Sequence, residues 1–424
     1  MKQLKGIMAR AVLLGCAAGM VTSVAMADIT PGTVLSAANI DELKGQQFDG
    51  HLLGDLLADS QEMMIRQHGW TMELQPTRPM GVEPRAAEVT QKFAGQATLG
   101  SDLLLQNYTS GIPFPEIDET DPQAGYKLAY NILRYGWVAD TLDLDPMYFL
   151  VIDGKKGLQR EMGWRYKRFL TNGRLSAPYS DGGEITKYES LINLYPQDSR
   201  GLGILTVNYS DGRLADTYAY IKSIRRVRRL SSGAWADPVS ATDFLTDETF
   251  GINLEPTWYQ DWQIVGSRWI MAVAHGQIRG LDLSKTDPAE RFPDMRLDEA
   301  PYWNFNEVWE PREVWLLEAT PPQSHLNSKR LLHVDKDVNA PMMSWIESFD
   351  RKGDLWRVSA LAYNDKDIRL DSGQSGVGIS IVGVYDVQRL HATVLYRSED
   401  GWKYNPPDAK KADFTPESLP RSLR

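Results

Sequence analysis

The chain has 424 residues, a formal net charge of −10 at pH 7 and a single cysteine, Cys16. An acidic chain lacks the basic footprint that general nucleic-acid binding requires, and one cysteine excludes an intrachain disulfide framework. The length allows one large domain or two ordinary ones, whose stability must come from packing.

The first 27 residues predict a cleavable secretion signal and a mature protein outside the cytoplasm. Three basic residues precede an apolar stretch over residues 11–24, and Ala25–Ala27 places small residues at the cleavage positions. The stretch is shorter than the roughly 20 residues that span a bilayer. We expect cleavage after Ala27, which removes three positive charges and leaves a net charge near −13. A competing interpretation takes Leu13–Cys16 as a lipobox, with Cys16 as a lipid-anchored N-terminus.

Residues 28–140 are predicted to form helices and loops. A long helix is expected to begin at Asp121, an N-cap followed by Pro122 at the first helical position, and to end near Asp140. Three shorter helices are expected over residues 36–44, 58–68 and 84–93. No later apolar run approaches the roughly 18 residues of a transmembrane helix, so no membrane span is predicted.

Residues 141–405 show short β-type runs joined by polar turns, which indicates an antiparallel meander. The expected strands cover residues 164–170, 202–209, 217–227, 262–273, 314–319, 330–334, 342–349, 355–363, 376–387 and 391–397. Asn172–Gly173 is a strong hairpin signal. The polar, proline-containing tail over residues 406–424 is expected to be poorly ordered.

These elements predict an α+β fold, in which one large curved antiparallel sheet is covered on its concave face by the helices of residues 28–140. Incomplete cover would leave an apolar cavity between sheet and helices. The 13 tryptophans, a high number for this length, fit either a wide β core or such a cavity. Composition alone leaves both interpretations open.

Motifs for catalysis or metal binding are weak. With no cysteine after residue 16 and scattered histidines, a structural zinc site is not predicted. Residues 335–339 resemble the start of a calcium loop but continue with Ala340–Pro341 in place of glycine, so a turn between strands is expected. Gly373–Gly376 lacks the spacing of a serine-nucleophile elbow. Asp140, Asp143 and Asp145 are expected to be solvated.

The most unusual local feature is the run Arg225-Arg226-Val227-Arg228-Arg229 in an acidic chain. On a strand, Arg226 and Arg228 would share one face. Arginine binds carboxylates and phosphates bidentately, so the run could meet an anionic head group or an acidic partner. A buried ion-pair network, or a solvated edge that prevents aggregation, would explain it equally.

Several segments in order resemble the bacterial family of domains of unknown function 1329, whose members are described as similar to outer-membrane lipoprotein-sorting proteins. The matching segments are 111–115 with 121–125, Arg225–Arg229, 261–266, 312–315, 329–330 and 349–357. Together they cover nearly all of the chain after residue 27. Residues 230–243 depart from the family pattern.

The resemblance implies a LolA/LolB-like open barrel that holds lipid or acyl chains, a periplasmic location, and RND-type exporters or outer-membrane proteins as partners. It implies no cofactor and no catalytic residue. The leading hypothesis is therefore a periplasmic carrier or accessory protein for a lipid or other amphipathic ligand in envelope transport. A non-enzymatic docking protein and a hydrolase with two carboxylates are the alternatives. The residues expected to contact the ligand are Trp164, Trp262, Trp269, Trp315, Trp345, Arg225, Arg226, Arg228 and Arg229.

Overall fold

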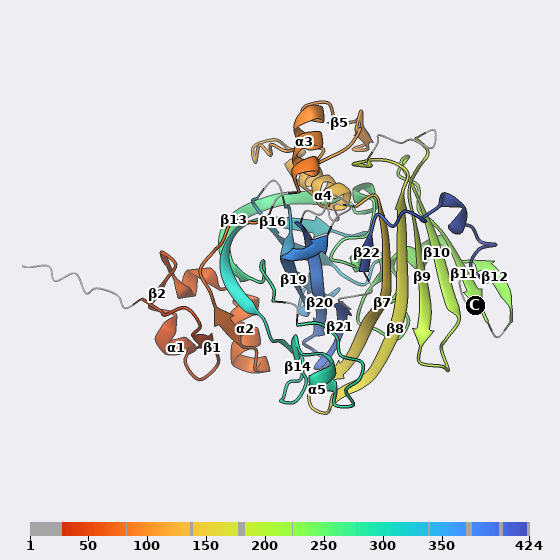
Figure 1. The fold of residues 1–424 in the computed structure, drawn as a ribbon. Coiled ribbons are helices and arrows are strands. Elements are labelled where there is room, and N and C mark those ends of the chain that lie inside the picture. Colours follow the sequence, from red (N-terminus) through yellow and green to blue (C-terminus); the bar gives the residue numbers. More distant parts are fainter. Residues whose placement is uncertain are drawn as a thin grey trace, which may run out of the picture.

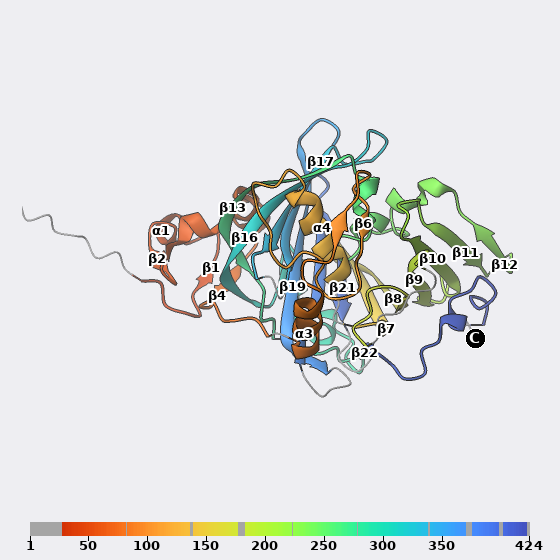
Figure 2. The ribbon, with the colours of Figure 1, turned by 90° about the horizontal axis from the view of Figure 1, so that it is seen from above.

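A computed structural model describes residues 28–81, 83–135, 139–176, 183–222, 224–277, 279–337, 340–369, 375–397 and 402–421. The predicted signal peptide and the lipobox with Cys16 lie outside these residues. Among the described residues, 16 strands form one sheet, drawn in Figures 1 and 2. They are β1 (Val34–Leu35), β4 (Met72–Leu74), β7 (Thr141–Asp153), β8 (Gly157–Leu170), β9 (Ile185–Tyr195), β10 (Leu202–Tyr209), β11 (Asp216–Ile221), β12 (Arg226–Arg229), β13 (Asp261–Ala272), β16 (Val308–Thr320), β17 (Lys329–Asp335), β18 (Met343–Phe349), β19 (Leu355–Arg369), β20 (Ser375–Asp386), β21 (His391–Arg397) and β22 (Trp402–Tyr404).

The sheet consists of two antiparallel meanders joined in the middle. Strands β7 to β12 pair in chain order, and so do β16 to β21. The last strand of the second meander, β21, pairs with the first strand of the other, from His391 opposite Asp153 to Arg397 opposite Met147. The predicted large, mostly antiparallel sheet is confirmed, and the short contact of β4 with β16 is parallel. Strand β12 lies at one edge.

Three small two-stranded sheets complete the strands of the described residues. They are β2 (Gln47–Phe48) with β3 (His51–Leu52), β5 (Thr98–Leu99) with β6 (Leu105–Gln106), and β14 (Met295–Arg296) with β15 (Asn304–Phe305). The described α-helices are α1 (Ile40–Leu43), α2 (Asp59–His68), α3 (Pro84–Phe93), α4 (Ala124–Tyr135) and α5 (Pro288–Arg291). Helices α2 and α3 match the predicted ranges within one residue.

Helix α4 is shorter than predicted and packs closely on the sheet. The Asp121 side chain accepts a hydrogen bond from the backbone N–H of Gln123 at 2.8 Å in the turn before the helix, which begins at Ala124 and not at the predicted Pro122. Gly125 brings the helix backbone against the carbonyl of Trp262 on β13, where a Cβ atom would lie only 2.1 Å from that oxygen. A side chain at this position would push α4 off the sheet.

Strand β7 was not predicted, because its first half carries Asp143, Asp145 and Pro146 and does not read as a strand. In the structure, the Asp143 side chain is largely buried and pairs with Arg165 on the neighbouring strand β8 at 2.5 Å. Asp140 is buried as well and accepts a 2.6 Å hydrogen bond from the Leu175 N–H. The expectation that these acids are solvated is wrong for Asp140 and Asp143, because their partners lie 35 and 22 positions further along the chain, respectively.

Strand β9 was also missed, since the Asn172–Gly173 signal suggested a tight hairpin. The structure has Gly173 at φ 72°, but β9 begins only at Ile185. The turn at residues 350–354 behaves as predicted, with the Asp350 N–H donating to the Asp354 carbonyl at 2.9 Å between β18 and β19. Strand β17 ends at Asp335 and β18 begins at Met343, so the predicted turn falls between two strands, although residues 338–339 lie outside the described residues.

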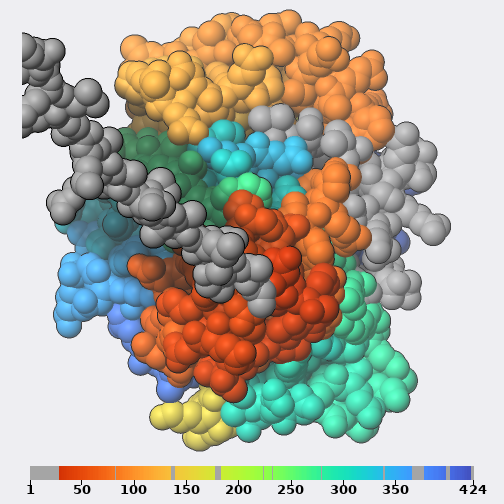
Figure 3. Space-filling view, turned by 90° about the vertical axis from the view of Figure 1, so that its left-hand side faces the viewer, coloured from red at the N-terminus to blue at the C-terminus, as the bar shows by residue number. Residues whose placement is uncertain are grey.

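The two faces of the sheet are covered by different parts of the N-terminal region. One apolar cluster joins α4 and residues 239–262 to one face, which we call the inner face. A second cluster joins residues 29–74 and 292–309 to the opposite face. In Figure 1, α3 and α4 accordingly lie above the sheet and α1 and α2 beside it. Figure 3 shows the N-terminal residues next to the segment that contains α5. A single helical cover of one concave face is therefore not confirmed.

The C-terminal segment differs from its expected disorder. Phe414 and Leu419 are buried in a third apolar cluster on the outer side of β8 to β11. The Phe414 ring lies 5.9 Å from that of Phe169 and 6.2 Å from that of Tyr188. These two apolar side chains bury surface against the sheet, and the pairing of β22 with β7 holds the start of the same segment.

Candidate functional site

The candidate site is a cavity of about 220 Å³ on the inner face, between β7 to β11 and the segment of residues 230–259. We call this segment the covering segment; it contains the short 3₁₀ turns at Ser232–Ala236, Thr246–Glu248 and Pro256–Trp258. The floor is formed by Met147, Phe149, Leu191, Ile204, Thr206 and Thr217, and the roof by Leu230, Ala234, Pro238, Val239, Thr249 and Phe250. Most of these side chains are apolar and of moderate size.

The cavity arises from the way in which the side chains of β10 divide between the two faces of the sheet. Leu205 and Val207 point to the outer face, where the C-terminal tail covers them. Ile204 and Thr206 alternate with them and point inward. The covering segment bridges these inward side chains and does not fill the space above them, so an apolar cavity remains.

The second half of the covering segment is anchored to the sheet by buried charges. Glu248 pairs with Arg357 at 2.9 Å and with Arg330 at 3.4 Å, and all three side chains are at most 3% exposed. These two arginines also donate to backbone carbonyls of the segment, Arg330 to Gly251 and Arg357 to Asp243, each at 2.7 Å. Charges buried in this way must stay paired, which fixes residues 243–251 against β17 and β19.

A second anchor joins the same half of the segment to residues beyond β16. The Asp247 carboxylate accepts hydrogen bonds from the Tyr259 hydroxyl at 2.6 Å and from His325 Nε2 at 3.1 Å. The backbone N–H of Asn327 donates to His325 Nδ1 at 3.0 Å, so the Nε2 atom carries the proton. Burial raises the pKa of Asp247, but its partners outweigh that effect and hold the pKa below the ordinary value.

The first half of the covering segment, residues 230–241, is held by ring contacts of Trp235 with Trp258 and His325 and by the Thr246 N–H, which donates to the Asp237 carbonyl at 2.9 Å; its described residues form no ion pair. Most of its residues are exposed or half-buried, and Val239 is the buried exception. The Val239 N–H donates to the Phe244 carbonyl at 2.9 Å, which ties this half to the anchored half. The cavity thus has a roof with one fixed and one exposed part.

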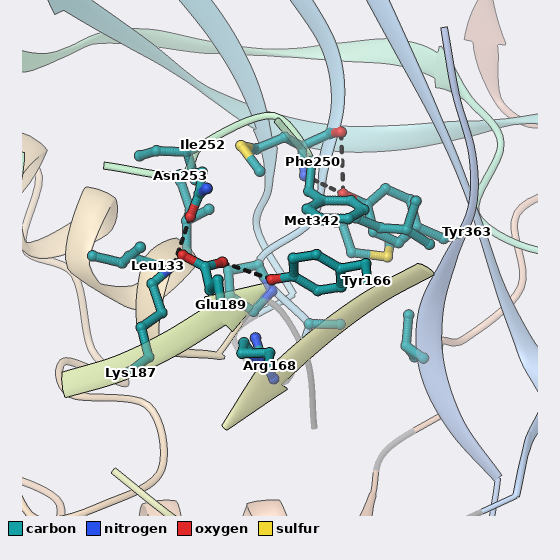
Figure 4. A pocket seen from close by; sticks show the side chains of 16 residues that line it. Leu133, Tyr166, Arg168, Lys187, Glu189, Phe250, Ile252, Asn253, Met342 and Tyr363 are labelled. Atoms are coloured by element: carbon teal, nitrogen blue, oxygen red, sulfur yellow. Dashed lines mark hydrogen bonds and ion pairs between the residues drawn. The ribbon is translucent and has the colours of Figure 1, made fainter. Parts of the chain in front are cut away.

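A smaller cavity of about 50 Å³ adjoins the first one. Figure 4 shows its lining, to which α4 contributes Leu133 and β19 contributes Tyr363. Tyr166 and Phe250 line both cavities, with ring centroids 5.2 Å apart, and form the partition between them. Movement of one aromatic ring would join the two spaces.

A buried polar group lies at this partition. Glu189 accepts a 2.6 Å hydrogen bond from the Tyr166 hydroxyl and pairs with Lys187 at 3.0 Å. The Lys187 ammonium also donates to the Asn253 side-chain oxygen at 2.6 Å, as Figure 4 shows. Asn208 donates to the second Glu189 oxygen at 3.0 Å. No sequence motif marks these residues, because four of them alternate in the ordinary way on β8, β9 and β10 and Asn253 comes from the covering segment.

Burial and pairing act against each other in this polar group. Burial lowers the pKa of Lys187, although Glu189 partly compensates. Burial alone would raise the pKa of Glu189, but Lys187, Tyr166 and Arg168 together hold it below its usual range. Glu189 is therefore a charged acceptor satisfied by its neighbours, and the group holds the partition in one geometry.

The five predicted tryptophans do not converge on one cavity. Trp164, Trp262 and Trp315 belong to the inner-face cluster, whereas Trp269 and Trp345 pack on the opposite face. None of the five lines the two cavities described above. A ligand contact by these tryptophans stays a prediction.

The arginine run forms the edge strand β12 and the turn before it. Arg225, with φ 50°, lies in the turn, and Arg226, Arg228 and Arg229 lie on the strand. All four are exposed. Arg229 pairs with Asp216 on β11. Among the described residues, the other three arginines form no ion pair, so a buried ion-pair network does not account for the run.

In the described ranges, no group of three or more His, Cys, Asp and Glu side chains comes together as metal ligands would. None of the helices described is both long and apolar enough to cross a bilayer. The backbone of Ser375 and Gly376 begins β20, while residues 373–374 lie outside the described ranges.

The sequence model of the family described as "Protein of unknown function (DUF1329)" matches residues 34–420. The chain belongs to this family. The match covers most of the chain, including both meanders and the covering segment, and confirms the resemblance inferred from the ordered motifs. No curated protein matches the sequence.

Three solved structures are similar to the chain, each with 16% sequence identity. An outer membrane lipoprotein-sorting protein domain from Vibrio parahaemolyticus and a DUF1329 family protein from Desulfovibrio piger each match with a TM-score of 0.47, covering 71% of this chain and 100% of theirs. The LolA superfamily protein NE2245 from Nitrosomonas europaea matches with a TM-score of 0.38, covering 66% of this chain and 91% of its own.

Proposed function

We propose that this protein is a periplasmic carrier or accessory protein that binds the apolar part of a lipid or other amphipathic ligand for envelope transport. The observation that carries the proposal is the cavity of about 220 Å³ beneath the covering segment, lined mainly by apolar side chains. Binding and release would need no covalent step.

The volume limits what the cavity can hold. An apolar cavity of about 150 Å³ binds benzene, so 220 Å³ suits a larger ring or a short acyl segment. It is too small for several complete acyl chains, whose remainder would have to lie outside or in the adjoining space beyond Tyr166 and Phe250. Each 100 Å² of apolar ligand surface removed from water contributes about 2.5 kcal/mol.

The uneven attachment of the roof supports reversible binding. Residues 243–251 are held to β17 and β19 by the buried ion pairs of Glu248, whereas residues 230–241 are mostly exposed. Ligand entry would then occur by movement of the exposed half, with the anchored half keeping the cavity in place. The predicted secretion signal supports the periplasmic location.

The test is native mass spectrometry with lipid extraction on protein purified from its host. We expect the wild-type protein to retain a lipid or other amphiphile, and the variants Ile204→Trp and Thr206→Trp, which fill the cavity floor, to be empty. Leu283→Trp adds the same ring at a side-chain position that is 59% exposed and should retain the ligand. Repeatedly empty wild-type protein, or filled variants that keep the same ligand, would contradict the proposal.

A second candidate is a docking protein for an RND-type exporter or an outer-membrane protein. The observation that favours it is the exposed edge strand β12, whose outer backbone groups could pair with a partner strand. A pull-down distinguishes the two: a partner that survives Thr206→Trp but is lost when Val227 is changed to proline supports docking without carriage.

A further inference from the structure

We infer that the ligand carries an anionic head group, a carboxylate or a phosphate, and that Arg226 and Arg228 hold this group at the rim of the cavity. The assignment rests on the carrier function proposed above, because it places the head group relative to an apolar tail in the 220 Å³ cavity. It separates the four arginines of the run into two that face the ligand and two that do not.

The pairing of β11 with β12 decides which arginines face the cavity. Ala219 lies opposite Arg228, and Ile221 lies opposite Arg226. The ladder continues past β12, where the Leu230 N–H donates to the Thr217 carbonyl at 2.8 Å. Side chains alternate along a strand, so residues 226, 228 and 230 share one face.

That shared face is the face of the cavity. Leu230 and Thr217 both line the 220 Å³ space. The intervening residues Tyr218, Tyr220 and Val227 pack in the third apolar cluster, on the opposite face. Two independent contacts thus orient the strand: the cavity lining on one side and the tail cluster on the other.

The spacing suits a head group that follows a tail out of the cavity. With a rise of about 3.3 Å per residue, the Cα atom of Arg228 lies about 7 Å from that of Leu230, and the Cα atom of Arg226 about 13 Å from it. Arg228 is therefore near enough to Leu230 for its side chain to meet a group that leaves the cavity there, and Arg226 lies one step further along the same face. A ligand whose tail passes Leu230 would meet two guanidinium groups in succession.

The charges along the rim favour an anion. Arg226 and Arg228 are exposed and, within the part of the chain that the structure describes, neither forms an ion pair. Arg229 is already paired with Asp216 and belongs to the other face, and Arg225 lies in the turn. Asp237 and Glu189 also line the cavity, but Glu189 is neutralised by Lys187, so the two cations stand against the carboxylate of Asp237. Bidentate contacts by arginine suit both carboxylates and phosphates.

If the arginine run were only a solvated edge that prevents aggregation, all four arginines would have the same effect on ligand binding. If Arg226 and Arg228 hold the head group, neutralising this pair weakens the binding of an anionic ligand, whereas neutralising Arg225 and Arg229 does not. Each double change removes two positive charges. This equality of charge makes the second pair a matched control.

Binding is measured by isothermal titration calorimetry, below the critical micelle concentration, with dodecanoate, dodecyl phosphate and the uncharged dodecyl maltoside. For the variant Arg226→Gln/Arg228→Gln we expect affinity for the two anionic probes to fall about tenfold. Affinity for the maltoside should stay within about twofold. The variant Arg225→Gln/Arg229→Gln should bind all three probes within about twofold of the wild type. Thermal unfolding of both variants checks that each is folded.

The outcomes separate this inference from the carrier function. If the wild type binds the uncharged probe and both double variants bind the anions equally, the arginine assignment is wrong and the carrier function stands. If the wild type binds no probe, both fail. A preference for dodecyl phosphate over dodecanoate would identify phosphate as the head group, and the reverse preference a carboxylate.

Discussion

The two meanders of the sheet use their side chains in different ways. Around β16 to β20, both faces are covered, and the opposite face carries a continuous group of rings in which Trp70 contacts Trp309, Trp345 and Tyr385 at centroid distances of 4.9–5.9 Å. Around β9 to β12, the inner face carries Leu191, Ile204, Thr206 and Thr217 beneath an incompletely anchored roof, and a cavity remains. Aromatic rings therefore fill the opposite face of the second meander, whereas side chains of moderate size, together with Phe149, Tyr166 and Phe250, border the cavity.

The largest effect is expected where the packing is complete. Trp345 is fully buried, and its indole N–H donates to Ser60 Oγ at 2.8 Å. We expect Trp345→Ala to lower the free energy of unfolding by about 3–5 kcal/mol, because it leaves a large cavity among rigid rings. Denaturant titration measures this loss. A loss below about 1 kcal/mol would mean that this region is as loosely packed as the meander of β7 to β12, which lines the cavity.

The next effect concerns the anchor of the covering segment. Glu248→Gln removes the charge that neutralises Arg330 and Arg357, so we expect a loss of about 3–4 kcal/mol of unfolding free energy. Asp237→Asn removes a carboxylate from the first half of the segment and should change stability by less than about 0.5 kcal/mol. Similar losses for both variants would show that the two halves of the segment are held equally.

A pH effect is expected from His333, whose pKa is lowered to about 4 by burial. Between pH 6.5 and pH 4 the unfolded chain takes up a proton that the folded protein does not, so stability falls as the pH falls through this window. We expect this residue to account for a loss of about 3 kcal/mol between those limits. His333→Gln should lose correspondingly less stability on acidification in chemical denaturation at a series of pH values.

His391 provides an internal contrast to His333, because its hydrogen bond to Asp243 raises its pKa above the ordinary value. Its contribution is complete below the ordinary value of about 6.5 and is lost as the pH rises through the raised pKa. The wild type and His333→Gln both contain His391, so both lose this contribution to stability as the pH rises. An identical pH profile for the wild type and His333→Gln would therefore contradict the burial effect assigned to His333.

The smallest effect is expected in the cavity itself. Ile204→Phe places its added atoms in existing space, so we expect the free energy of unfolding to change by less than about 1 kcal/mol. Ala360→Leu enlarges a side chain that is 1% exposed on β19 and should cost about 1–3 kcal/mol. Equal costs at the two positions would indicate that the cavity is closed in solution.

The antiparallel sheet and its strongest turns could be predicted, because period-two alternation and turn residues are local features. Strands β7 and β9 could not, since β7 contains acids that become acceptable only when Arg165 pairs with Asp143 from the next strand. The tail was misjudged for a similar reason: Phe414 gains its partners, Phe169 and Tyr188, only after the sheet has formed.

The sequence by itself determined the family, the antiparallel meanders and the cluster of arginines, all of which depend on residue types at short spacing. Only the tertiary structure decided that Arg226 and Arg228 share a face with the cavity, and that the tryptophans divide between two faces. The physical reason is that a cavity is volume left unfilled by segments far apart in the chain. Glu248 lies 109 residues before its partner Arg357. A local sequence pattern therefore cannot show which part of the covering segment such an ion pair fixes.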